Sequence, residues 1–142
     1  MDNIGAKTLR LFDLQKLKLN VPKFSYIDAE TLANKLFVKG KIQKTELEKI
    51  SKKIVGTLNC ATYAVRSSAL IEDSKLHSFA GQFKTLIKVK PENLAQSIEE
   101  LINHAYQYLN GKIEQFSILI QEYIEADFAG ITFTRILLED MK

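Results

Sequence analysis

Apolar residues recur at helical spacing in the first third of the chain, with short polar breaks between them. The spacing predicts a helix over residues 6–19, and a proline-containing break at residues 21–24 leads into a short strand near Tyr26. Asp28 then stands where it can cap a second helix, and Gly40 is expected to end that helix. This part of the chain therefore predicts small helices around one strand.

The spacing of the apolar residues changes from helical to strand-like in the middle of the chain. Thr45 and Glu48 have the spacing of a capping box at the start of a third helix. β-Branched and aromatic residues then predict a strand over residues 62–66 and another over residues 82–89. Between them, the serine- and charge-rich residues 67–77 predict a loop.

The last third returns to helical spacing and then to strands. Pro91 suits the first turn of the longest helix, whose apolar stripe covers residues 94–109 and stops at residues 110–111. Strands are predicted over residues 116–124 and 129–138. This order of elements predicts an α+β fold with a mostly antiparallel sheet covered by helices.

The composition is that of a globular domain. The chain has 142 residues, of which 46% are apolar and 26% are charged, and this length suffices for one core. No apolar run is long enough to cross a bilayer and no signal-peptide pattern opens the chain, so we expect a cytoplasmic protein without a membrane partner. The single cysteine, Cys60, fits a reducing compartment. The net charge of +3 without a basic cluster argues against nucleic-acid binding.

Arg66 is the first residue that predicts chemistry, because it ends an apolar strand and precedes two serines. A guanidinium at such a place faces water, a carboxylate or a ligand anion, and it binds phosphate with two parallel hydrogen bonds. The small residues at 78–81 add a turn whose backbone can approach a phosphate closely. The plainer interpretation is that Arg66 pairs with one of the acidic residues at 72–73 and that the glycine only makes a turn.

A longer pattern surrounds Arg66: VRSSA, an ED pair, SFAGQ, and a threonine four residues after the glycine. This segment, residues 65–89, resembles the nucleotide-binding segment of phosphoenolpyruvate synthase and its relatives, the pyruvate phosphate dikinase family, which also includes rifampicin phosphotransferases. Weaker matches follow in the family's order at both ends of the chain. They are residues 4–7 with 21–24, and residues 120–124 with 129–134.

The resemblance implies one lobe of an ATP-grasp domain, with ATP as the cofactor between two lobes. Carried over to the matching positions, Lys7 and Arg66 contact the phosphates, with Arg66 as the catalytic residue. Gly81 and Thr85 belong to the loop that covers the phosphates. The hinge strand whose backbone meets the adenine edge consists of Gln121, Glu122, Tyr123 and Ile124.

Several of these roles have a plainer alternative. Lys7 alone is typical of a solvated helix start, and a cation there is mildly unfavourable for the helix dipole. Gln121 and Glu122 are typical of the outward positions of an alternating strand, and Tyr123 is typical of a core residue.

The resemblance also implies parts that lie outside residues 1–142, which correspond to the N-terminal lobe alone. In the family the Mg²⁺ ligands, the phosphohistidine domain and the pyruvate-binding domain follow this lobe. His77 is therefore rejected as the phosphocarrier. With His104 far away in the sequence, no metal site is predicted in the chain.

We accordingly expect the ATP-binding lobe of a phosphoenolpyruvate synthase-like, or pyruvate, water dikinase-like, phosphotransferase, inactive alone, either as a fragment or as a stand-alone protein. A non-catalytic nucleotide-binding or interaction module stays open, and so does a lobe of a rifampicin phosphotransferase-like kinase. Pyruvate enters only through the missing domains. Exposed apolar residues at 129–138 further predict a homodimer through that strand.

Overall fold

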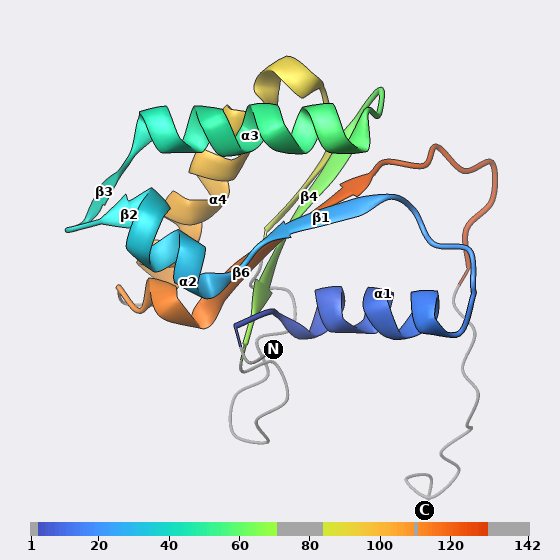
Figure 1. Cartoon of the computed structure of the whole chain (residues 1–142), viewed down its shortest axis with the longest axis horizontal. Helices are drawn as coiled ribbons and strands as arrows, with labels where there is room; N and C mark the ends of the chain where they lie inside the picture. Colours follow the sequence, from blue (N-terminus) through green and yellow to red (C-terminus); the bar gives the residue numbers. More distant parts are fainter. Residues whose placement is uncertain (1–2, 71–83, 110, 131–142) are drawn as a thin grey trace, which may run out of the picture.

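Four strands form one antiparallel sheet in a computed structural model that describes residues 3–70, 84–109 and 111–130 (Figure 1). Across the sheet the order is β1 (Phe24–Ile27), β6 (Phe116–Glu122), β4 (Tyr63–Ala69) and β5 (Thr85–Val89). Each neighbouring pair is antiparallel, and the two central strands, β4 and β6, pair over seven positions. The predicted α+β class with an antiparallel sheet is confirmed.

Helices cover both faces of the sheet. Two long helices, α3 (Lys44–Leu58) and α4 (Leu94–Tyr108), pack on one face, whereas α1 (Ala6–Lys16) lies along the opposite face (Figure 1). Shorter elements connect them: α2 (Ala29–Thr31), the π-helical turn η1 (Leu32–Leu36), the hairpin strands β2 (Phe37–Val38) and β3 (Lys41–Ile42), and the 3₁₀ turns η2 (Pro91–Asn93) and η3 (Ile113–Gln115).

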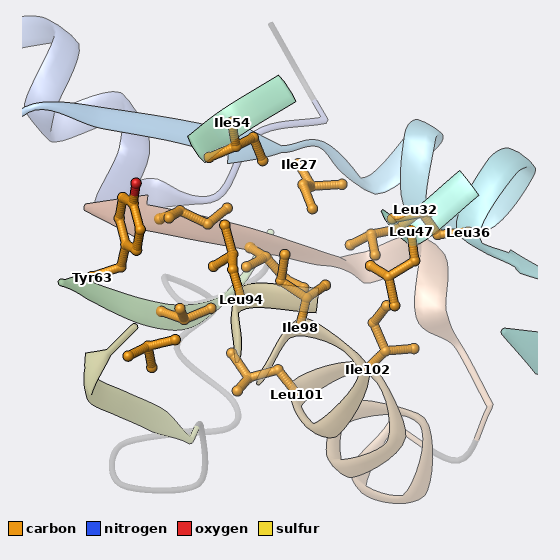
Figure 2. Packing of buried hydrophobic residues seen from close by; sticks show 14 of the residues in the cluster. Ile27, Leu32, Leu36, Leu47, Ile54, Tyr63, Leu94, Ile98, Leu101 and Ile102 are labelled. Atoms are coloured by element: carbon orange, nitrogen blue, oxygen red, sulfur yellow. The ribbon is translucent and has the colours of Figure 1, made fainter. Parts of the chain in front are cut away.

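The apolar core fills the space between the sheet and the helices α3 and α4. The stripe predicted on the longest helix is buried there, with Ile98 and Ile102 fully enclosed (Figure 2). Val65, Ile118 and Ile120 from the two central strands belong to the same apolar cluster. Each fully buried side chain of this size contributes about 1.5–3 kcal/mol of transfer free energy. This face of the sheet therefore carries most of the driving force for folding.

The second helix begins as predicted and ends early. The Asp28 carboxylate accepts a hydrogen bond from the Thr31 amide at 2.7 Å, which confirms the cap. The helical turns end at Leu36, and the chain then forms the hairpin β2–β3. Lys39 and Gly40 connect its strands with φ values of +51° and +74°, a pair of left-handed residues that suits a two-residue hairpin turn.

Two local predictions are wrong. α3 starts at Lys44 after Gln43 without a side-chain cap, so Thr45 lies inside the helix and forms no capping box. Ser67 and Ser68 belong to strand β4 rather than to a loop, because the ladder continues: the Ser67 amide and hydroxyl both donate to the Lys84 carbonyl oxygen, at 3.2 and 2.8 Å.

The predicted strand over residues 129–138 lies outside the described residues, apart from Ala129 and Gly130, which are in no strand. The homodimer expected through it stays a prediction. Within the described ranges, the helices are all too short or too polar to traverse a bilayer.

Candidate functional site

The face of the sheet under α1 differs in chemistry from the core face. Because side chains alternate along a strand, Ala64, Arg66 and Ser68 of β4 point away from α3 and α4. In the register of the sheet, Arg66 stands between Leu119 of β6 and Thr85 of β5. Thr85, predicted to belong to the phosphate loop, is exposed beside it.

Arg66 shares one pocket with all four residues predicted to form the hinge. This pocket has a volume of about 160 Å³. Its lining consists of Pro22, Ala64, Arg66, Gln121, Glu122, Tyr123 and Ile124. Small-molecule sites usually measure about 300–1,000 Å³, so a hollow of this size holds only part of a nucleotide.

Arg66 is half-buried, and its Nε atom is fully enclosed without a hydrogen-bond partner among the described residues. The acidic residues at 72–73, which the plainer interpretation offers as its partners, lie outside those residues. A buried guanidinium nitrogen without a partner costs free energy that a bound anion would recover. Arg66 is the cationic side chain in the lining of this pocket, and it can therefore bind a phosphate there.

Most backbone groups of the hinge strand already form hydrogen bonds with neighbouring segments. The Glu122 amide donates to the Lys23 carbonyl oxygen at 2.8 Å, and the Tyr123 amide donates to the Thr62 carbonyl oxygen at 3.0 Å. Ile124 is the first residue beyond this ladder, and its side chain is 55% exposed. Ile124 is therefore best placed to offer backbone groups and apolar surface to a flat base.

The alternation expected for an outward-facing Gln121 is wrong, because its side chain is only 9% exposed. Helices cover both faces of the sheet, so residues from Phe116 to Gln121 are all buried. Glu122 and Tyr123 are half-buried in the lining of the pocket.

Lys7 reaches the same strand from α1. Its ammonium donates to the carbonyl oxygen of Ser67 at 3.4 Å, so the cation lies one residue along β4 from Arg66. The side chain itself is exposed. The second face of the sheet thus places Lys7 near the Ser68 end, Arg66 in the middle, and Ile124 at the opposite end.

Sequence reasoning pointed to Ser68 of β4 as part of the motif after Arg66, but it missed Ser117 of β6, a buried serine that is the direct partner of Ser68 in the sheet register. The helix start at Gly5 packs against both of them. A polar residue inside the otherwise apolar run FSILI was the available signal for Ser117.

One ion pair lies beside Tyr123, a residue of the pocket lining. The Lys88 ammonium is hydrogen-bonded to the Glu125 carboxylate, and it lies 5.8 Å from the centre of the Tyr123 ring. The hydrogen bond to Glu125 raises the pKa of Lys88 above its usual range.

Burial, followed by the charge of Glu122, raises the pKa of the Cys60 thiol, with Lys23 acting in the opposite direction. The pKa of Tyr63 is also raised, chiefly by burial.

The remaining predicted positions lie elsewhere. Gly81 and His77 fall outside the described residues. His104 lies on α4, on the core side of the sheet, and its ring stacks on Tyr108 at 5.0 Å. In the described part of the chain, no three histidine, cysteine, aspartate or glutamate side chains gather as metal ligands do. Among the described residues, the groups around Arg66 are cations and hydroxyls with one carboxylate, Glu122, and this set does not fit a magnesium ion.

Larger hollows occur away from these residues. One of about 540 Å³ lies between α3 and the start of α4, and its lining includes Ser51, Gly56 and Ala95. It contains none of the residues predicted for a site.

Comparison with known proteins gives a family match over most of the chain. A family model described as the AMP/ATP-binding domain of pyruvate phosphate dikinase matches residues 35–139, a range that includes Arg66 and the hinge but not Lys7. The prodigiosin synthesizing transferase PigC of Serratia marcescens is 35% identical over 83 residues, covering 53% of this chain and 9% of the relative. The uncharacterized phosphotransferase YvkC of Bacillus subtilis (strain 168) is 24% identical over 164 residues, covering 92% of this chain and 19% of the relative. The chain thus spans less than a fifth of either relative, and no solved structure gives a significant match.

Proposed function

Because this chain belongs to the family of the AMP/ATP-binding domain of pyruvate phosphate dikinase, we propose that it binds ATP on the face of the sheet under α1. In this proposal the chain is the N-terminal ATP-binding lobe of a phosphoenolpyruvate synthase-like phosphotransferase and has no turnover alone. The observation that carries the proposal is the pocket that joins Arg66 to the hinge residues 121–124.

The adenine lies at the hinge end in this proposal. Ile124 offers its exposed side chain and the backbone groups beyond the ladder, and the Glu122 carboxylate can accept hydrogen bonds from ribose hydroxyls. From the position of Leu119, opposite Arg66, to Ile124 the chain covers five residues, or about 17 Å of extended strand. That length gives an extended nucleotide room to lie along β6.

The phosphates then lie over β4. Arg66 supplies a charge-assisted, bidentate contact, and Lys7 supplies a second cation beyond it, near Ser67. Gly81 and Thr85 are proposed to belong to the loop that covers the phosphates. Phosphoryl transfer depends mainly on such positioning and charge stabilisation, which is the chemistry that these residues offer. No step is assigned to magnesium here, because the described residues do not supply its ligands.

The acceptor of the phosphoryl group is proposed to bind outside this chain. The two relatives are named a transferase and a phosphotransferase, and these names support group transfer without fixing an acceptor. Pyruvate is the proposed acceptor if the chain is a lobe of a phosphoenolpyruvate synthase-like enzyme. A cytoplasmic location is part of the same proposal.

Equilibrium titration of the chain with ATP and with adenosine tests the proposal. Arg66→Met should weaken ATP binding about tenfold or more, because a hydrogen-bonded contact to a charged group is worth about 1.5–3 kcal/mol. It should leave adenosine binding within twofold. Arg66→Lys keeps the positive charge and loses the forked guanidinium group, so its ATP affinity should lie between those of the wild type and Arg66→Met.

Arg10→Met is the matched control, because Arg10 is an exposed arginine on α1 with a side chain 80% accessible. Equal ATP affinity for the wild type and Arg66→Met would contradict the proposal, and so would a wild-type chain that binds no ATP.

A further inference from the structure

Ser117 joins three elements through one hydroxyl group. Its Oγ atom accepts a hydrogen bond from the Gly5 amide at 3.0 Å and donates one to the Ser68 carbonyl oxygen at 3.1 Å. Ser117 and Ser68 have no exposed surface, so water does not compete for these bonds. The start of α1, strand β4 and strand β6 are thereby fixed to one another.

Gly5 makes this contact possible because it has no side chain. A Cβ atom at Gly5 would lie 2.1 Å from the Ser68 hydroxyl oxygen and 2.7 Å from that of Ser117, both far below contact distance. The Gly5 carbonyl oxygen accepts from the Thr8 amide at 3.0 Å, so the same residue starts the hydrogen bonds of α1. The packing of Gly5 against Ser68 and Ser117 therefore sets the position of the first turn of the helix.

Lys7 lies in that first turn. Its ammonium reaches the Ser67 carbonyl oxygen at 3.4 Å, between Arg66 and Ser68 along β4. Around this turn, Thr8 Oγ1 and Ser68 Oγ are fully buried and have no hydrogen-bond partner among the described residues. The start of α1 is therefore held by the hydrogen bonds of Ser117 in spite of two uncompensated hydroxyl groups beside it.

We propose that Ser117 is a positioning residue for the phosphates of the nucleotide, acting through Gly5 to hold Lys7 at a fixed place relative to Arg66. This role rests on the proposed function, since it presumes that ATP lies over β4. Ser117 touches no phosphate itself. The hydroxyl fixes the distance between the two cations, and a guanidinium and an ammonium at a fixed separation bind a polyphosphate with less loss of entropy.

Titration of the full chain with ATP and adenosine tests the role of Ser117. Ser117→Ala removes the hydroxyl with little change of volume and should weaken ATP binding about tenfold, as expected when a charge-assisted contact is misplaced. Adenosine binding should stay within twofold. In the Lys7→Met background the same substitution should cost no further affinity, because Ser117 acts through Lys7.

Ser51→Ala is the matched control. Ser51 is also buried, on α3 at the other side of the sheet, and its hydroxyl has no partner in the described part of the chain. Its removal should leave both affinities unchanged. If Ser117→Ala lowers the folded fraction, Ser117→Cys, which keeps a weak donor at similar volume, replaces it in the same titrations.

The outcomes separate the two proposals. A wild-type chain that binds ATP, together with a Ser117→Ala variant that binds it equally well, overturns the positioning role alone. Equal losses for ATP and adenosine, or losses that simply add to those of Lys7→Met, also overturn it, because they indicate a general structural effect. A wild-type chain without ATP binding overturns the proposed function and this inference together.

Discussion

Val65 and Arg66 are neighbours in β4, yet their side chains enter opposite environments. Val65 is fully buried against Ile120 and the helix α4, in a cluster of apolar residues. Arg66 points to the side of α1, where Ser68, Ser117 and Thr8 are buried as well. The face toward α3 and α4 encloses mainly apolar side chains, with the small serines Ser51, Ser67 and Ser97 among them. The face toward α1 buries a larger share of polar side chains beside Arg66.

The contrast is sharpest in the hydrogen bonds. Within the described ranges, four buried side-chain atoms have no partner: Thr8 Oγ1, Ser51 Oγ, Arg66 Nε and Ser68 Oγ. All but that of Ser51 belong to the side of α1. Unsatisfied groups of this kind cost about 1–3 kcal/mol each, so a sequence that keeps three of them together gives up stability for another purpose. We infer that this purpose is ligand binding, and each prediction below tests that division of tasks.

The largest effect is expected on the core face. Ile98→Ala removes a fully buried side chain from α4 and should lower the free energy of unfolding by about 2–5 kcal/mol. ATP affinity of the folded fraction should stay unchanged, because Ile98 packs on the side away from Arg66. Urea unfolding monitored by circular dichroism, with an ATP titration of the same variant, measures both. If the folded Ile98→Ala variant also bound ATP more weakly, the two faces would not have separate roles in folding and binding.

Gly5→Ala should have the next largest effect. The added methyl group would collide with Ser68 and Ser117, and overpacking of this kind costs about 1–3 kcal/mol. Gly56→Ala is the control, since nothing lies within 4 Å of its Cβ position and it sits in α3. Alanine there should stabilise the protein by about 0.5–1 kcal/mol. Opposite signs in urea unfolding are expected, and equal signs would contradict the close seating of α1.

The facing serines Ser68 and Ser117 should respond differently to the same substitution. Ser117→Ala breaks two buried hydrogen bonds and should destabilise the protein by about 1–3 kcal/mol. Ser68→Ala removes an unpartnered hydroxyl while its carbonyl bond to Ser117 remains. It should be neutral or stabilising by up to about 1 kcal/mol. Thermal unfolding of both variants decides the point, and a similar loss for both would mean that Ser68 Oγ has an unrecognised partner.

The smallest effect is a pH dependence. Burial raises the pKa values of Cys60 and Tyr63, so the folded chain keeps both protons longer than the unfolded chain does. The stabilising contribution of each group is therefore complete below its unfolded pKa and is lost as the pH rises through the folded value. Stability should decline above about pH 8.5, first through Cys60 and then through Tyr63. Urea midpoints between pH 7.5 and 10.5 measure the decline, and Cys60→Ala should make its onset later. A flat profile in both proteins would argue that neither group is buried.

The elements with strong periodicity could be predicted from the sequence. The stripe of α4, the cap at Asp28 and the strand β6 follow from local pattern, because each depends on residues close in the chain. The false capping box at Thr45 and the predicted loop at Ser67 have a common cause. Serine and threonine favour caps and turns locally. At Ser67 the tertiary ladder to Lys84 overrides that preference, and at Thr45 the helix simply begins one residue earlier, at Lys44.

The candidate site divides in the same way. The motifs around Arg66 and the hinge pointed to residues that meet in one pocket, although they are more than fifty positions apart. The burial of Gln121 was not predictable, because it depends on a helix covering the second face. Ser117 was also missed, since its partners Gly5 and Ser68 are brought to it only by the fold.

The most direct test of the account is an amide ¹H–¹⁵N spectrum of the ¹⁵N-labelled chain recorded during a titration with ATP. If ATP binds on the side of α1, the shifted amides should cluster there, at Lys7, Arg66, Thr85 and Ile124, whereas those of Ser51 and Ala95 beside the larger hollow should stay in place. Shifts concentrated between α3 and α4, or no shifts at any ATP concentration, would contradict it.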